Sequence, residues 1–228
     1  MIQQAHSAYN GEDYDRAFKL YTELSEAGNP EAQTSLGYMY QNGLACEKDD
    51  AKAYELYSKA AESKQPYALF NLGIIYANGL GGVAHDQFKA HELFMEAAIR
   101  EVVPAMYEVG LMLERGLGCL QNFSEAAFWY EEGAKRGSLE AFNNLGVLYK
   151  EGHGVIQDDK RCFICFSRAA EGGLAEGLYN LGLLYDQGIG CEADQDKALE
   201  YCRAAAYKGH EKAKGIIKKL QEDGKIVF

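Results

Sequence analysis

One stretch of the sequence brings together residue types that could do chemistry. Gly152-His153-Gly154 has the glycines of a loop that cradles phosphate, and its histidine, with Asp158 and Asp159, offers groups for general acid–base catalysis. The P-loop of nucleotide-binding proteins also has a Gly-Lys-Ser or Gly-Lys-Thr sequence, and the chain has neither. It also lacks Gly-x-Ser-x-Gly, Ser-x-x-Lys and His-Glu-x-x-His. A turn between helices, with a solvent-facing histidine, is therefore the favoured interpretation.

Cys162-Phe-Ile-Cys165 has the spacing of a metal-binding or redox pair. No second cysteine pair and no nearby histidine completes four zinc ligands. We therefore predict no metal, no cofactor and no catalytic residue, and we expect reduced thiols as in a cytosolic protein.

The composition excludes several classes of function. The chain has 228 residues and a formal net charge of −11, which repels nucleic-acid phosphates and favours a protein or peptide partner with a basic surface. No apolar run of 18 residues predicts a membrane span, and the opening MIQQAHSAYNGEDYD does not resemble a signal peptide. We expect a cytoplasmic protein, or a lumenal or periplasmic one if the chain is excised from a longer secreted or membrane protein.

An internal repeat organises the chain. A Leu-Gly or Val-Gly pair returns every 36 or 37 residues, at 36–37, 72–73, 109–110, 145–146 and 181–182. A second series has a small residue followed four positions later by a larger one, at 17 and 21, 53 and 57, 90 and 94, 126 and 130, 162 and 166, and 198 and 202. Offsets of four place side chains on one face of a helix. Each repeat is therefore predicted to be a hairpin of two helices, called helix A and helix B.

The Gly-x-Gly elements fall between helix A and helix B. A glycine just past the last periodic residue ends a helix in the left-handed conformation, because it has no Cβ. Polar residues that cap helix B are expected just after it, at Asp49-Asp50, Asp86, Ser124, Asp158-Asp159 and Asp194. In the same turn, Cys46, Cys119 and Cys191 share a position for which we expect a small buried apolar role.

The segments AFNNLGVLYKEGHGVIQDDKRCFICFSRAAEGG and LYNLGLLYDQGIGCEADQDKALEYCRAAAYKG resemble the Sel1-like repeat, a relative of the tetratricopeptide repeat. The resemblance implies an all-α, right-handed superhelical solenoid of about six helical hairpins plus a C-terminal capping helix. We expect a single solenoid over 1–228. It would comprise a tetratricopeptide-like hairpin at 1–31, five repeats over 32–210, and a capping helix and tail at 211–228.

The same resemblance implies a non-catalytic scaffold or adaptor that binds other proteins. Two alternatives are a structural subunit of a larger assembly and a small-molecule-binding or hydrolytic member of the family. In related solenoids helix A lines the concave side, so we expect a partner segment there. The predicted contact residues are Tyr38, Phe70, Ile74, Tyr107, Leu111, Asn143 and Tyr179. The alternative for these side chains is packing between neighbouring A helices.

Overall fold

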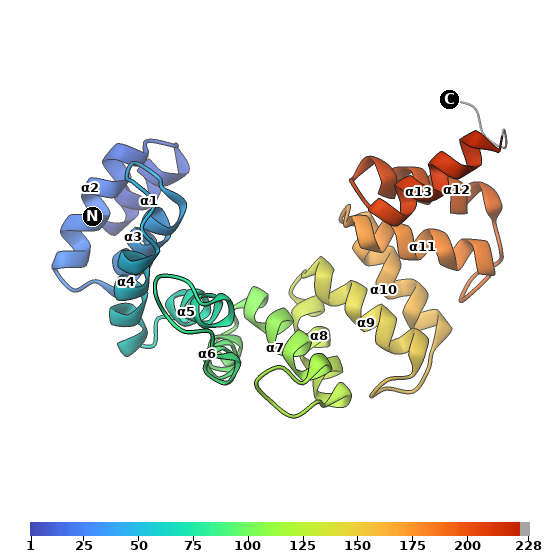
Figure 1. The fold of residues 1–228 in the computed structure, drawn as a ribbon, viewed down its shortest axis with the longest axis horizontal. Helices are drawn as coiled ribbons and strands as arrows, with labels where there is room; N and C mark the ends of the chain where they lie inside the picture. Colours follow the sequence, from blue (N-terminus) through green and yellow to red (C-terminus); the bar gives the residue numbers. More distant parts are fainter. Residues whose placement is uncertain (224–228) are drawn as a thin grey trace. The chain divides into compact units, whose positions relative to one another are not determined.

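The computed structural model describes residues 1–223, and the regular structure of this part of the chain is entirely α-helical (Figure 1). The chain forms two compact units, Met1–Gln121 and Asn122–Phe228. The first unit contains α1 (Ile2–Asn10), α2 (Tyr14–Glu26), α3 (Pro30–Asn42), α4 (Asp50–Glu62), α5 (Pro66–Asn78), α6 (Gln87–Ile99) and α7 (Val103–Arg115). The second contains α8 (Phe123–Lys135), α9 (Leu139–Glu151), α10 (Asp159–Glu171), α11 (Ala175–Gln187), α12 (Gln195–Tyr207) and α13 (Glu211–Glu222).

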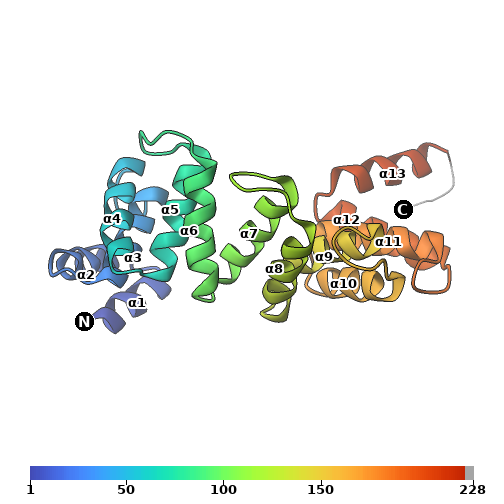
Figure 2. The ribbon, with the colours of Figure 1, turned by 90° about the horizontal axis from the view of Figure 1, so that it is seen from below.

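Within each unit, helices that follow one another in the sequence pack side by side. The pairs α1/α2, α3/α4 and α5/α6 form the hairpins of the first unit, and α9/α10 and α11/α12 form those of the second (Figure 2). The odd-numbered helices α1 to α11 are the predicted A helices, and the even-numbered ones are the B helices. The prediction of an all-α solenoid of helical hairpins is confirmed. The last five residues of the predicted C-terminal tail, 224–228, lie outside the described part of the chain.

A contact between a glycine and an aromatic ring recurs where helix A meets helix B. The ring of Tyr57 on α4 lies so close to Gly37 of α3 that a Cβ built on the glycine would be 2.8 Å from Cε1 of the ring. The hydroxyl of Tyr57 donates a hydrogen bond to Gln41 Oε1 at 3.0 Å. A buried phenol needs such a partner, because an unpaired hydroxyl in an apolar setting is costly. The repeat period of the sequence therefore places a glycine of helix A opposite a large ring of helix B.

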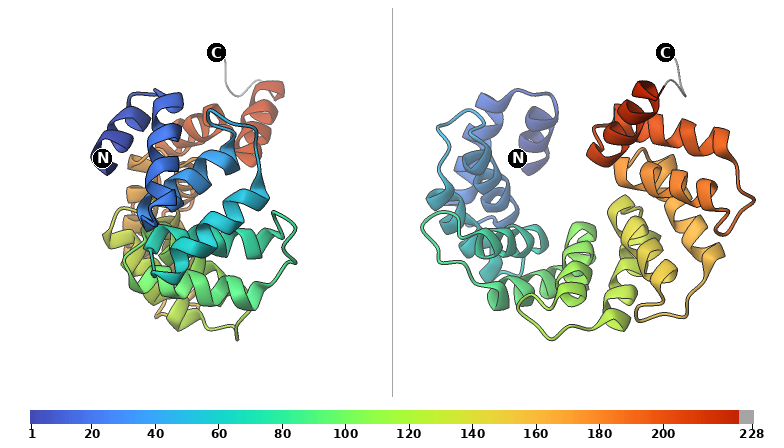
Figure 3. Two further views of the ribbon diagram at one scale, coloured as in Figure 1. Left: turned by 90° about the vertical axis from the view of Figure 1, so that its left-hand side faces the viewer. Right: turned by 45° about the vertical axis from the view of Figure 1, so that its right-hand side comes forward.

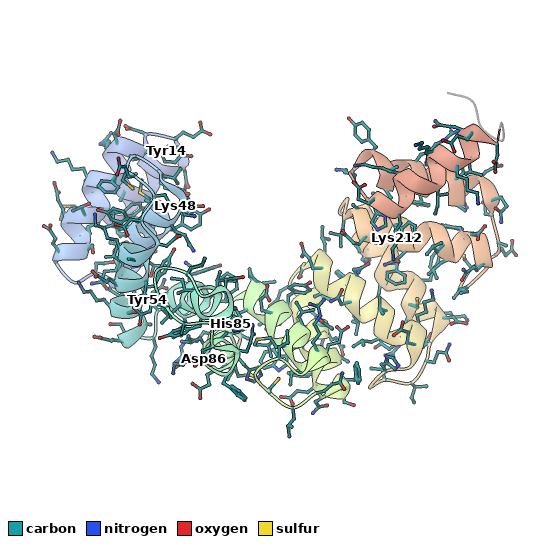
Figure 4. The ribbon with its side chains drawn as sticks, viewed as in Figure 1. Tyr14, Lys48, Tyr54, His85, Asp86 and Lys212 are labelled. Carbon is teal, nitrogen blue, oxygen red and sulfur yellow. The ribbon has the colours of Figure 1, made fainter. Side chains whose placement is uncertain are left out.

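The helix ends follow the predicted pattern with one correction. Asp86 accepts a hydrogen bond from the Lys89 amide at 3.0 Å, and it lies with His85 in the loop before α6 (Figure 4). The prediction that Ser124 caps α8 is wrong. Asn122 is the capping residue, and its side chain accepts from the Glu125 amide at 3.2 Å. The Ser124 hydroxyl instead donates to the carbonyl of Gly154 at 3.0 Å.

Each Gly-x-Gly loop has a second role that the sequence did not reveal. Gly152 ends α9 with φ +70°, as predicted, but Gly154 also has a positive φ, +71°. A Cβ on Gly154 would overlap the backbone of Phe123 and Ser124 at the start of α8, in the preceding repeat. The second glycine therefore lets the loop lie directly on the preceding helix B. Such loops lie along one edge of each unit (Figure 3).

The α5–α6 loop carries the additional residue that lengthens its repeat. In this loop Gly81 makes the equivalent contact, since a Cβ there would be 2.5 Å from the carbonyl oxygen of Asp50. Gly82 follows with φ +79°, and no heavy atom lies within 4 Å of a Cβ built on it. The additional residue is therefore accommodated where the loop faces open space.

The turn cysteines differ from the prediction. Cys46 and Cys191 are half-buried rather than buried, and their thiols donate to the carbonyls of Met39 at 3.6 Å and Leu184 at 3.8 Å. Cys119 is half-buried too, and its thiol donates to the carbonyl of Met112 at 3.5 Å. These three residues therefore tie the loop to the last turn of helix A through a weak hydrogen bond as well as through packing.

Candidate partner-binding site

The first unit contains a hollow of about 330 Å³ with aromatic walls. Tyr9 of α1, Tyr21 of α2, Tyr38 of α3, and Tyr67 and Phe70 of α5 form these walls, and we call the hollow the aromatic pocket. Three helical hairpins contribute to it, because small residues at the crossings let successive helices approach closely. It is therefore a product of the repeat stacking rather than of any single hairpin.

Polar side chains complete the lining of the aromatic pocket. They are Thr34 and Ser35 of α3 and Asn71 of α5. Thr34 donates a hydrogen bond to the Pro30 carbonyl at 2.8 Å, so its hydroxyl is held by its own helix. The pocket thus combines ring faces with a few hydrogen-bonding groups, which is the usual composition of a recognition site.

Tyr9 of the aromatic pocket packs against two other tyrosines. Its ring meets the rings of Tyr14 and Tyr38 edge to face, with centroids 5.5 and 6.5 Å away. Burial raises the pKa of Tyr9, and the neighbouring Tyr38 raises it further. Burial also raises the pKa of Tyr21. The phenols of Tyr9 and Tyr21 are therefore neutral at physiological pH.

Two of the rings are accessible to a partner. Tyr38 is 43% exposed and Tyr67 is 55% exposed. Tyrosine is among the residue types that are enriched at the binding hot spots of protein interfaces. The pocket therefore has an exposed aromatic rim, Tyr38 and Tyr67, and a floor of half-buried rings, Tyr9 and Phe70.

One carboxylate, that of Glu31, lies near the aromatic pocket. Glu31 at the start of α3 lies 3.6 Å from His6 Nε2, and its charge adds to the raised pKa of Tyr21 after the larger effect of burial. The whole chain carries a net charge of −11. Aromatic faces and carboxylates both attract cations.

The structure brings two of the seven predicted contact residues together in this pocket, Tyr38 and Phe70. The ring of Phe70 also packs against Phe94 of α6, with centroids 5.7 Å apart. Ile74, Tyr107 and Leu111 are half-buried residues of α5 and α7 in the same unit, outside the lining of the aromatic pocket.

The remaining predicted residues, in the second unit, contact their own chain. Asn143 is buried and accepts a hydrogen bond from Asn180 Nδ2 at 2.9 Å, which links α9 to α11. Tyr179 stacks on His210 with ring centroids 4.2 Å apart. Both side chains contribute to packing between repeats.

Tyr9 and Tyr67 line the pocket but were not among the predicted contacts. Tyr67 occupies the repeat position of Glu31, Pro104, Glu140 and Glu176, so an aromatic ring there departs from the rest of the series. This departure from the repeat pattern could have identified Tyr67 as a contact residue from the sequence. Tyr9 lies in the N-terminal hairpin, whose shorter turn takes it out of the repeat register.

The two stretches whose residue types could do chemistry, Gly152–Gly154 and Cys162–Cys165, form no site. His153 is half-exposed, lies 3.0 Å from a Glu151 carboxylate oxygen and packs against the ring of Phe123 at 5.0 Å. Burial raises the pKa of Cys162 to about 12 and that of Cys165 to about 11. Within residues 1–223, no group of three or more histidine, cysteine or acidic side chains could hold a metal ion, and no helix there could cross a membrane.

Comparison with known proteins gives a consistent result. The family model described as the Sel1 repeat matches residues 9–29, 30–64, 66–100, 103–138, 140–174 and 175–210. No curated protein matches the chain.

Solved structures agree with the family match. A Sel1 repeat protein from Oxalobacter formigenes is 29% identical with a TM-score of 0.90, over 96% of this chain and 86% of that one. The protective antigen c5321 of uropathogenic Escherichia coli, which has an SLR fold, is 30% identical with a TM-score of 0.83, over 97% of this chain and 48% of that one. YrrB, a TPR protein with an unusual peptide-binding site, is 18% identical with a TM-score of 0.51, over 87% of this chain and 97% of that one, a likeness of fold alone.

Proposed function

The chain belongs to the Sel1 repeat family, and from this premise we propose that it is a non-catalytic scaffold that holds a basic segment of a partner protein in the aromatic pocket. Sel1 and tetratricopeptide-like folds commonly mediate protein–protein interactions, and Sel1 repeat proteins are generally non-catalytic scaffolds. The observation that carries the proposal is the exposed aromatic rim formed by Tyr38 and Tyr67 in an acidic protein.

The energetic case rests on the ring faces. A lysine or arginine over a tyrosine face gains about 0.5–1 kcal/mol when exposed and about 2 kcal/mol when desolvated. The aliphatic stem of the same side chain buries apolar area against the floor formed by Tyr9 and Phe70. A segment that places one such side chain in the pocket and others near the acidic surface would bind through attraction that salt weakens.

A double variant tests this proposal. Tyr38→Ser with Tyr67→Ser removes the rim, and both residues are exposed enough to be replaced without a cavity in the core. Tyr207→Ser is the matched control, because Tyr207 is 91% exposed and lies on α12 in the other unit. Circular dichroism and thermal unfolding establish that all three proteins are folded.

The binding measurement uses a labelled peptide of alternating lysine and alanine and a matched peptide of alternating glutamate and alanine, followed by fluorescence anisotropy. We expect the lysine peptide to bind, to weaken with salt and to lose at least tenfold in affinity in the double variant. The three proteins carry the same charge, so their difference isolates the rings. An equal loss in Tyr207→Ser, or equal binding of the glutamate peptide, would refute the proposal.

A further inference from the structure

The last complete hairpin departs from the others where helix B covers helix A. In three earlier hairpins a ring fills this place, since a Cβ built on Gly37, Gly73 or Gly146 would lie 2.8, 2.6 or 2.8 Å from the ring of Tyr57, Phe94 or Phe166. Each of these rings is at most 2% exposed. The glycine and the ring are thus complementary parts of one packing unit.

In the hairpin α11/α12 the ring is missing. Cys202 stands at its repeat position, opposite Gly182 of α11. A Cβ on Gly182 would meet the carbonyl oxygen of Ala198 at 3.2 Å and Cβ of Tyr201 at 3.4 Å, but no aromatic atom as near. Ala198 and Cys202 are half-buried, whereas Ala53 and Tyr57, at the same positions of α4, are fully buried.

The space that the ring would fill is part of a pocket of about 260 Å³. Its lining includes Tyr179, Gly182 and Asp186 of α11, Ala198 and Cys202 of α12, and Ile216 of α13, and we call it the C-terminal pocket. Figure 4 labels Lys212 at the start of α13, the helix that forms one wall. A mostly apolar hollow of this size accommodates a single aromatic ring.

The polar end of the C-terminal pocket indicates which ring. Asp186 occupies the repeat position of Gln41, the residue that accepts the hydrogen bond of the Tyr57 hydroxyl at 3.0 Å. A ring seated on Gly182 as Tyr57 is seated on Gly37 would direct its hydroxyl toward the Asp186 carboxylate. Asp186 is exposed at the edge of the pocket. A phenol donates to such a carboxylate in a short, charge-assisted bond, whereas a phenyl ring offers it no donor.

We propose that the C-terminal pocket binds a tyrosine side chain of a partner protein, which takes the place that Tyr57, Phe94 and Phe166 fill in their own hairpins. This site lies in the second unit and involves none of the residues of the aromatic pocket. The proposal is therefore independent of the proposed function. Burial raises the pKa of the Cys202 thiol, so the wall beside the ring is neutral.

The first test uses 4-methylphenol and toluene as probes, followed by two-dimensional amide NMR spectra. We expect 4-methylphenol to shift the amides of Gly182, Asp186 and Cys202 and to bind at least tenfold more tightly than toluene. Cys202→Tyr places a ring of the chain's own in the pocket, so it is expected to abolish probe binding and to raise Tm. Cys202→Ala is expected to retain probe binding. Binding that is unchanged in Cys202→Tyr would overturn the proposal.

Asp186→Leu keeps the test decisive even if Cys202→Tyr fails to fold. It is expected to remove the preference for 4-methylphenol over toluene, and a preserved tenfold preference would overturn the assignment of the hydroxyl partner. Phe228→Ala tests whether the chain supplies the ring itself. A gain in probe affinity in Phe228→Ala would overturn the proposal that a partner protein supplies the ring, and unchanged affinity would support that proposal.

A peptide distinguishes a partner's side chain from a free phenol. Acetyl-Gly-Tyr-Gly-amide is expected to produce the same amide shifts as 4-methylphenol and to bind at least tenfold more tightly than acetyl-Gly-Phe-Gly-amide. Failure of the tyrosine peptide to bind, while 4-methylphenol does, would overturn the proposal, because the pocket would then admit only small molecules.

Discussion

Replacing Gly154 with alanine should loosen the contact between the α9–α10 loop and α8. Two costs add at this site. The positive φ of +71° costs an alanine about 1 kcal/mol. The new Cβ would overlap the backbone of Phe123 and Ser124, so the loop must withdraw until carbon contacts of about 3.5 Å are restored.

Withdrawal of the loop also breaks the hydrogen bond from Ser124 Oγ to the Gly154 carbonyl, now 3.0 Å long. Its net contribution is about 1 kcal/mol. Lost packing against the start of α8 adds about as much again, so we expect a total near 3 kcal/mol. Gly137→Ala is the matched control in the same unit. Its φ is +93°, and no heavy atom lies within 4 Å of the added Cβ, so only the conformational cost of about 1 kcal/mol applies.

Hydrogen exchange measures the difference locally, because repeat proteins open region by region. The Asp158 amide, which donates to the Tyr149 carbonyl at 3.0 Å, reports on the loop. A cost of 3 kcal/mol would accelerate its exchange by about 150-fold in Gly154→Ala. For the control, the amide of Ser138, which follows Gly137 and donates to the Gly133 carbonyl at 3.0 Å, should accelerate by only about fivefold. Equal acceleration in the two variants would refute the role of the close approach and leave only backbone strain.

Three further predictions concern single side chains. Tyr57→Phe removes the hydrogen bond to Gln41 and keeps the ring packing, so it should cost about 1 kcal/mol and lower Tm by about 2–4 °C. Asn122→Ala should cost about 1 kcal/mol because the first turn of α8 loses its cap, measured by urea unfolding. Burial raises the pKa of Glu108, so its proton is bound more tightly in the folded chain and stability falls as pH rises through the interval between its unfolded and folded pKa values. Glu108→Gln should therefore raise Tm at pH 7 and leave it unchanged near pH 4.

A specific result would contradict each of these three predictions. A loss in Tyr57→Phe as large as in Tyr57→Ala would mean that the ring packing contributes nothing. A greater loss in Ser124→Ala than in Asn122→Ala would restore Ser124 as the cap. A gain in Glu108→Gln that persists at pH 4 would show that shape, rather than ionisation, is responsible.

The periodicity of the sequence predicts those features that recur in every repeat. The pairing of Gly37 with Tyr57 follows from two series with the same period, and Tyr38 and Phe70 follow from helical offsets. The cap of α8 was misplaced by two residues, because Asn122 and Ser124 both suit the start of a helix and only the backbone decides between them.

Contacts between repeats were harder to predict from the sequence. Every Gly-x-Gly element is explained by the helix it ends, so nothing local indicates that Gly154 also lies on α8. The same holds for Asn143, whose bond to Asn180 depends on the side-chain conformations of two helices. Tyr9 joined the aromatic pocket from a hairpin with a shorter turn, where the repeat register no longer applies.

The glycine pair of the α5–α6 loop also indicates where the first unit can be extended. Gly81 holds the loop against Asp50, while Gly82 next to it faces open space. A short peptide inserted after Gly82 would enlarge a loop that is already closed, which costs little free energy because closure entropy grows slowly with length. An epitope or a surface-coupling tag placed there would leave the aromatic pocket intact. The protein could therefore be immobilised through this loop for partner capture.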